Sequence, residues 1–249
     1  MRPYPLRLAL LGLCLAVAMA GAVRAEEPYQ QRWSGFATSL VGRSGEQRGN
    51  AVRAGAALDG TVIPPGGIFS FNDLVGARDR SKGYGAAPMI DPQGLLQDVP
   101  GGGVCQLAGT VYNAALLAGL EVVERHPHSR PVATLPPGRD ATIASWRKDL
   151  KLRNPHPVPL RLKVAALGDR LTASFWGHRA KDFTVAITTD TIPVAPETVA
   201  GGAHAGPRQA GKPGYSVVTH RILTRGESMT DQVISTDFYP PATRILEGP

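Results

Sequence analysis

Cysteine is scarce in this chain, which has 249 residues and only two cysteines, Cys14 and Cys105. Cys14 falls within residues 1–25, where two arginines, an apolar run and a final Val-Arg-Ala follow the pattern of a secretory signal peptide. The apolar run is too short and too rich in glycine and alanine to predict a stable membrane span. We therefore expect cleavage before Glu26 and export to the periplasm or the cell-wall space.

The predicted cleavage leaves Cys105 as the only thiol, which excludes an internal disulfide as a source of stability. A lone thiol outside the cytosol is open to oxidation. Three interpretations follow from the count. Cys105 could be a buried and inert residue, a reactive nucleophile, or one half of an intermolecular disulfide.

A strong excess of one charge is also missing. The whole chain carries +7, and residues 1–25 include three arginines and no acidic residue, which leaves +4 after cleavage. This mild positive charge suits contact with an anionic cell wall and does not indicate a nucleic-acid-binding protein.

Motifs for common cofactors are absent as well. The sequence has no phosphate loop, no dinucleotide fingerprint and no Gly-x-Ser-x-Gly elbow, so we expect no cofactor. It also lacks CxxC and HExxH spacings. Cys105, His126 and His128 could together supply three zinc ligands, but this is the weaker alternative and we expect no metal.

Hydrophobic patterns predict two helices and a series of strands. Residues 50–58 are helix formers behind Asn50 as a possible N-cap, and residues 104–120 are apolar or small almost throughout, as in a central helix that ends near Gly119. Residues 76–100 are typical of long loops. The strands are predicted at residues 68–71, 121–125, 140–146, 158–166, 170–177, 183–189, 215–224 and 228–235.

These elements predict an α+β fold, with a mainly antiparallel sheet packed around a central helix that begins at the Cys105 motif. We expect the main domain to cover residues 26–190. Residues 191–213 are rich in glycine, alanine and proline and predict a flexible linker. Residues 214–249 then form a small β-rich C-terminal tail.

The position of Cys105 bears on its chemistry. It follows Gly101, Gly102 and Gly103 at the predicted start of the central helix, where unpaired N–H groups and the helix dipole favour a thiolate. The N–H groups of the glycines and of Cys105 could form an oxyanion hole. A glycine-rich turn before a buried helix, without any chemistry, explains the same pattern equally well.

Two histidines could serve as the base for this thiol. His126 and His128 come about twenty residues after Cys105, where a helix packed on a strand would bring the chain back to the same end of the site. One of them could then exchange a proton with the thiol. Surface histidines in a proline-containing loop are the alternative.

Several segments together resemble the VanW-like family, in the expected order from about residue 33 to residue 177, and the tail resembles the segment that often follows this domain. The matching segments are PGGIFSFN at 65–72, VG at 75–76, GY at 83–84, GGGVCQ at 101–106, YNAA at 112–115, ERHPHS at 124–129, PGRDAT at 137–142, and DLK at 149–151 with Asn154.

Some members of this family are regarded as L,D-transpeptidases with a cysteine nucleophile. The resemblance therefore implies acyl transfer on peptidoglycan stem peptides through a Cys105 thioester. It favours His128 over His126 as the base, because His128 and Ser129 match the family's His-Ser pair. A cysteine peptidase of cell-wall peptides and a non-catalytic wall-binding module stay open as alternatives.

The resemblance also implies roles around this pair. Arg139 and Asp140 could orient the substrate or the histidine, and Arg80 and Tyr84 are expected in a loop that faces the site, with Arg80 holding a substrate carboxylate. The family commonly has a Ser/Thr-rich turn after Cys-Gln, whereas residues 107–110 are Leu-Ala-Gly-Thr. If those hydroxyls support catalysis, activity would be reduced or redirected.

Overall fold

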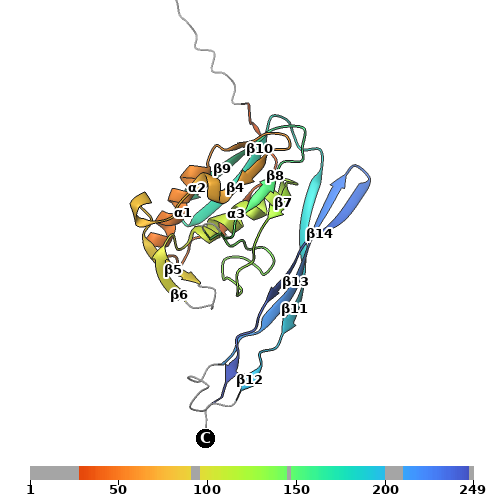
Figure 1. Ribbon diagram of the computed structural model, residues 1–249. Helices are drawn as coiled ribbons and strands as arrows, with labels where there is room; N and C mark the ends of the chain where they lie inside the picture. The colour runs from red at the N-terminus through yellow and green to blue at the C-terminus, as the bar shows by residue number, and fades with distance from the viewer. Residues whose placement is uncertain (1–27, 91–95, 145–146, 200–209, 247–249) are drawn as a thin grey trace, which may run out of the picture.

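The computed structural model of the protein describes residues 28–90, 96–144, 147–199 and 210–246, and the predicted signal peptide at residues 1–25 lies outside them. Strands outnumber helices and pair mainly in antiparallel fashion, which confirms the predicted α+β class. Figure 1 shows a body of helices and short sheets with a long three-stranded sheet along one side.

Two antiparallel sheets form the body. The larger has the order β1–β10–β9–β3, with β2 also paired to β10, and the smaller has the order β4–β8–β7. The predicted hairpin at 158–166 and 170–177 is confirmed as β9 and β10. The strands are β1 (Gln31–Arg32), β2 (Phe36–Ser39), β3 (Val62–Ile63), β4 (Ile68–Ser70), β7 (Glu121–Glu124), β8 (Lys151–Arg153), β9 (Leu160–Leu167) and β10 (Arg170–Gly177).

Two regions differ from the sequence prediction. Residues 76–100, predicted as long loops, contain the 3₁₀ helix η1 (Arg80–Lys82) and a hairpin of β5 (Ala86–Ile90) and β6 (Leu96–Pro100). Prolines in both strands hide the strand pattern and are tolerated because the sheet has only two strands. Residues 140–146 were predicted as a strand, but their described part forms only an isolated bridge between Ala144 and Lys148.

The first helix, α1 (Gly45–Leu58), begins earlier than predicted. Its N-cap is Ser44, which forms a capping box with Gln47, so the expectation that Asn50 caps the helix was wrong. The Asn50 side chain instead donates hydrogen bonds to the carbonyls of Gly85 and Gly102. A short helix, α2 (Phe71–Val75), follows β4.

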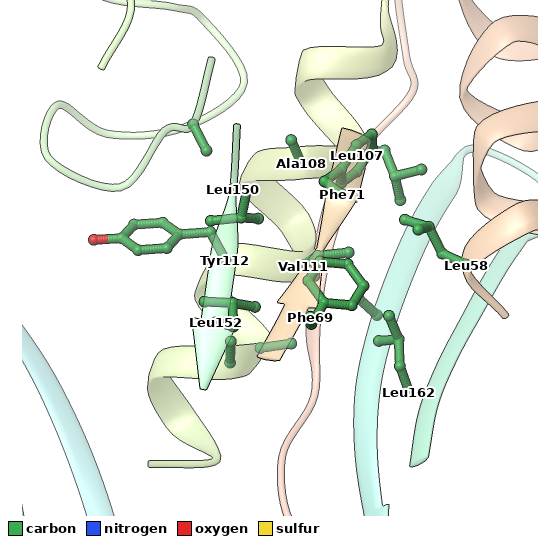
Figure 2. Close-up of a cluster of buried hydrophobic side chains, with 14 of the residues drawn as sticks. Leu58, Phe69, Phe71, Leu107, Ala108, Val111, Tyr112, Leu150, Leu152 and Leu162 are labelled. Atoms are coloured by element: carbon green, nitrogen blue, oxygen red, sulfur yellow. The ribbon is translucent and has the colours of Figure 1, made fainter. Parts of the chain in front are cut away.

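The predicted central helix is confirmed as α3 (Val104–Leu117), which packs against α1, β2, β10 and β11. All of its residues except Cys105 and Leu117 are buried. Gly119, just beyond the end of the helix, has a φ of 76°, which glycine adopts readily. Figure 2 shows Leu107 and Val111 of α3 in one cluster with Phe69 of β4 and Leu162 of β9. The apolar helix thus joins the two body sheets.

The long sheet has the order β11–β13–β14, and β12 and β15 form a separate parallel pair. Strand β11 ends at Val194, so it includes the first four residues of the 191–213 segment for which the sequence predicts a flexible linker. Where the sheet meets the body, Val217, Thr219 and Tyr239 are fully buried and Arg221 donates a hydrogen bond of 2.6 Å to the Leu120 carbonyl. The strands are β11 (Thr184–Val194), β12 (Thr198–Val199), β13 (Gly214–Arg225), β14 (Ser228–Tyr239) and β15 (Arg244–Ile245).

The core can be tested with two neighbouring residues of β4. Phe69 is 2% exposed and Ile68 is 59% exposed. We expect Phe69→Ala to lower the free energy of unfolding by about 3–5 kcal/mol, because it removes buried contacts and leaves a cavity beside α3. Ile68→Ala is the control and should change it by less than about 1 kcal/mol. Urea denaturation measures both, and equal effects would contradict this account of the core.

Candidate active site

The glycine loop before α3 is built for close backbone contacts. A Cβ atom on Gly102 would lie 2.3 Å from the Ala87 carbonyl oxygen, and one on Gly103 would lie 2.7 Å from the Gln47 carbonyl oxygen. Gly103 also has a φ of 98°, which L side chains rarely adopt. With Asn50 bound to the Gly102 carbonyl, these contacts fix the loop between α1 and β5.

This loop presents Cys105 as the second residue of α3. The thiol is partly buried and donates a long hydrogen bond of 3.6 Å to the Ile143 carbonyl. Within the described part of the chain, the N–H groups of Gly103 and Cys105 have no backbone acceptor outside the helix, whereas those of Val104 and Gln106 donate to carbonyls of the loop. These two N–H groups are among those that the start of a helix leaves without an intrahelical acceptor.

His128 lies beside Cys105, and each of the two side chains shifts the pKa of the other. On its other side, the imidazole Nδ1 is 2.5 Å from Oδ2 of Asp140, and the same oxygen accepts the backbone N–H of His128 at 2.7 Å. The Asp140 side chain is only 1% exposed. Thiol, imidazole and buried carboxylate thus stand in series.

Asp140 has further partners on its second oxygen. Oδ1 accepts hydrogen bonds from Arg125 at 3.0 Å and from the Tyr239 hydroxyl at 2.5 Å. Arg125 also donates through Nη1 to both carboxylate oxygens of Asp237 at 2.5 Å, and the Tyr239 oxygen accepts the backbone N–H of Gly138 at 2.8 Å. Because Asp237 and Tyr239 belong to β14, the long C-terminal sheet helps to hold the carboxylate behind the histidine.

These contacts shift three pKa values. Burial alone would raise the pKa of the Cys105 thiol, but the hydrogen bond and charge of His128 outweigh it and the pKa is lowered. Burial opposes protonation of His128, yet Asp140 and Cys105 raise its pKa to about 9. Burial is likewise outweighed at Asp140, whose pKa is lowered by His128 and Arg125. The shifts at Cys105 and His128 both act in the direction of a thiolate beside an imidazolium.

A cavity of about 840 Å³ opens over this pair, and Cys105, His128 and Ser129 lie in its wall. The volume is that of a site for a small molecule or short peptide. Much of the wall is apolar, with Pro88, Met89, Pro131, Val132, Ala133, Leu135 and Ile143.

The remaining residues expected at the site occupy different places. Ser129 lines the cavity, whereas Gly102 is buried beneath it. Arg139 donates to the Asn113 side chain at 2.5 Å and stacks over Phe36. These contacts place Arg139 beside α3 rather than in the cavity wall.

Two loop residues expected to face the substrate are also elsewhere. Tyr84 is only 4% exposed and belongs to the core. Arg80 is exposed in η1 and does not line the cavity. His126 pairs with Glu124 at 3.0 Å and does not line the cavity either.

Other residues of the matching segments have structural contacts. Asp149 accepts hydrogen bonds from the Ser70 hydroxyl and from the backbone N–H of Asn72. The side-chain amide of Asn154 donates hydrogen bonds to the Ile63 and Val158 carbonyls. The Thr110 hydroxyl is buried in α3 and donates to the Gln106 carbonyl at 2.7 Å. The one hydroxyl kept in residues 107–110 therefore supports the helix rather than facing the cavity.

Among the described residues, no group of three or more His, Cys, Asp or Glu side chains is placed to hold a metal ion. Within the same part of the chain, no helix has the length and apolar character needed to span a membrane.

A thiolate, an imidazolium and a buried carboxylate in series form the type of site that cysteine-dependent acyl transfer uses. The chain belongs to the VanW-like family, because the family model described as "VanW like protein" matches residues 46–176, which include Cys105, His128 and Asp140. The strands of the long C-terminal sheet lie outside this match.

Two curated proteins are similar to this chain. YoaR of Bacillus subtilis (strain 168), described as uncharacterized, is 38% identical over 127 residues, which make up 51% of this chain and 42% of YoaR. The Vancomycin B-type resistance protein VanW of Enterococcus faecalis (strain ATCC 700802 / V583) is 33% identical over 110 residues, or 42% of this chain and 40% of that protein. The matches thus span about two fifths of each relative.

Among solved structures, HP0197-G5 aligns with 28% of this chain and all of its own length, at 16% identity and a TM-score of 0.19. This score is too low to bear on the fold or the site.

Sequence reasoning missed the groups behind Asp140. Arg125 lies inside one of the matching segments, but nothing in the sequence indicates that it turns inward to two carboxylates. Asp237 and Tyr239 lie about one hundred residues away from Asp140. Their alternation along β14 is a weak signal that both face the body.

The coupling between Asp140 and the thiol makes a testable prediction. In Asp140→Asn, His128 loses its anionic partner, so its pKa falls from about 9 and the pKa of Cys105 rises. We expect the rate of alkylation by iodoacetamide at pH 6.5 to fall at least about fivefold, since only the thiolate reacts. Above pH 9.5 the difference from the wild type should shrink.

Asp98→Asn is the control for this measurement, because Asp98 is exposed in β6 and does not line the cavity. It should keep the wild-type pH profile. Identical profiles for the wild type and Asp140→Asn would show that the carboxylate does not act on the thiol through His128.

A second prediction concerns the contact of β14 with Asp140. Tyr239→Phe removes the hydroxyl that binds Asp140 and leaves the Gly138 N–H without its acceptor. We expect the free energy of unfolding to fall by about 1–3 kcal/mol.

Tyr215 is the matched control, since it lies opposite Tyr239 on β13. Its hydroxyl has no hydrogen bond to the described residues, so Tyr215→Phe should change the free energy by less than about 0.5 kcal/mol. Urea denaturation compares the two variants. Equal losses would mean that the Tyr239 hydroxyl does not stabilise Asp140.

Proposed function

We propose that this protein performs L,D-transpeptidase-like acyl transfer on peptidoglycan stem peptides through a Cys105 thioester, after export to the cell-wall space. The observation that carries the proposal is the series of Cys105, His128 and Asp140 at the wall of the cavity. Membership in the VanW-like family, one of whose proteins is named for vancomycin resistance, supports a substrate in the cell wall.

In the first half of the reaction, the Cys105 thiolate attacks the carbonyl carbon between the L-centre of the third stem residue and D-alanine. The resulting oxyanion accepts hydrogen bonds from the N–H groups of Gly103 and Cys105. The His128 imidazolium then protonates the departing amine of D-alanine, the C–N bond breaks and the thioester remains.

In the second half, an amine of a neighbouring stem peptide attacks the thioester and gives its proton to His128. The C–S bond breaks, and the Cys105 thiolate returns beside the imidazolium. Asp140 stabilises the imidazolium and fixes the ring with Nδ1 turned away from the sulfur. The raised pKa of His128 keeps the proton available for the leaving amine near neutral pH.

The alternatives differ in what reaches the thioester. Water as the acceptor would make the protein a cysteine peptidase with the same residues. A non-catalytic wall-binding module would require no base near Cys105. The interaction of His128 with the Cys105 thiol supports the enzymatic proposals over the binding module, because proton transfer needs a base close to the thiol.

Intact-mass spectrometry tests the proposal. The mature protein and Cys105→Ala are each incubated with a tetrapeptide stem fragment. We expect the wild type to gain the mass of the acyl group and to release D-alanine, while Cys105→Ala does neither.

The products separate the alternatives. Dimeric stems indicate a transpeptidase, and tripeptide alone indicates a peptidase. If the folded wild type forms no adduct and releases no D-alanine, the binding module becomes the better account. Circular dichroism of both proteins shows that the variant is folded.

A further inference from the structure

The wall of the Cys105 cavity is cationic. Arg43, Arg147 and Lys148 line it, and among the described residues that line it there is no aspartate or glutamate. Arg78 adds positive charge near the thiol and contributes to the lowered pKa of Cys105. The Asp140 carboxylate behind His128 is already paired with Arg125 and His128. The cavity therefore favours an anionic ligand.

Hydrogen bonds fix the backbone of Arg43, whereas its guanidinium group makes no such contact with the described residues. It lies in the turn between β2 and α1, where its N–H donates to the Leu40 carbonyl and its own carbonyl accepts from Arg48. The partly buried guanidinium has no partner among the described residues, and burial lowers its pKa. Partial burial without a counter-ion is unfavourable for a cation, so an incoming anion would find the guanidinium partly desolvated and available.

The chemistry of the guanidinium selects the kind of anion. Its N–H groups match the two oxygens of a carboxylate. The apolar residues that line the same cavity, such as Met89 and Leu135, suit hydrocarbon rather than a densely charged phosphate. Thr142, also in the wall, has a buried hydroxyl without a partner among the described residues. The wall thus combines cationic side chains, polar groups and apolar surface, as a peptide acid requires.

We propose that Arg43 binds a free carboxylate of the acyl donor, so that this protein acts on anionic stem peptides and discriminates against amidated ones. This inference rests on the proposed function. The carboxylate could belong to the terminal D-alanine or to the second residue of the stem. The chemistry at Arg43 is the same for both, and donors amidated at one position or the other distinguish them.

The first test needs no turnover. Iodoacetate and iodoacetamide both alkylate the Cys105 thiolate, and they differ in carrying a carboxylate or an amide. We expect Arg43→Gln to lower the ratio of the iodoacetate rate to the iodoacetamide rate at least about threefold, because the anionic reagent loses its partner. Arg170→Gln is the control, since Arg170 is exposed on β10 and outside the cavity, and it should keep the wild-type ratio. An unchanged ratio in Arg43→Gln would overturn the proposal.

The second test uses the reaction. With the free-acid tetrapeptide, Arg43→Gln should lower kcat/KM about 10- to 100-fold, mainly through KM, since a charge-assisted hydrogen bond is lost. Arg43→Lys should recover part of the loss. The wild type should turn over one of the two amidated donors poorly, and with that donor Arg43→Gln should cause little further loss. Equal losses for all donors would overturn the role of Arg43.

The two tests separate failure of this inference from failure of the proposed function. If the wild type processes none of the peptides, the proposed function fails, but the alkylation ratio still reports whether Arg43 receives a carboxylate beside Cys105. If the peptides are processed and the ratio does not respond to Arg43→Gln, the proposed function stands and the assignment of Arg43 is wrong.

Discussion

The structure depends on keeping the Asp140 carboxylate ionised in a place from which water is almost excluded. An unpaired buried charge is strongly unfavourable, so the chain surrounds it with donors from three directions. Arg125 follows β7, His128 comes from the loop beyond it, and Tyr239 comes from the last long strand. The same contacts orient the imidazole toward Cys105. Stability and reactivity therefore share one set of hydrogen bonds.

A second constraint comes from the crowding of backbones at the start of α3. The helix is buried on nearly every face, yet its second residue must reach a cavity. Three consecutive glycines allow this, since β5 and α1 approach so closely that a side chain at Gly102 or Gly103 would collide with their carbonyls. The N–H groups left without backbone acceptors are then a consequence of how the chain enters the helix.

The sequence predicted the α+β class, the central helix and the hairpins, because apolar periodicity and turn residues are local signals. The family resemblance brought attention to Cys105, His128 and Asp140, and the structure brings these three together. The resemblance could not show which polar residues of the matching segments have only structural contacts. Asp149 and Asn154 carry the same kinds of groups as Asp140 but bind backbone and neighbouring side chains. Long-range partners such as Tyr239 leave almost no local trace.

Because β14 contributes to the buried charge cluster, the part of the chain that folds as one unit is longer than the part that matches the family. The segment that matches the family ends at residue 176, whereas two partners of the buried charge cluster, Asp237 and Tyr239, lie some sixty residues further on. Similarity thus marks the part of the chain that shares ancestry, and the hydrogen bonds mark the part that must fold together. In a relative whose following segment is different, another group would have to take over the contacts with this carboxylate. The residues just beyond the shared segment are therefore where members of the family can diverge in stability while keeping the residues of the shared segment.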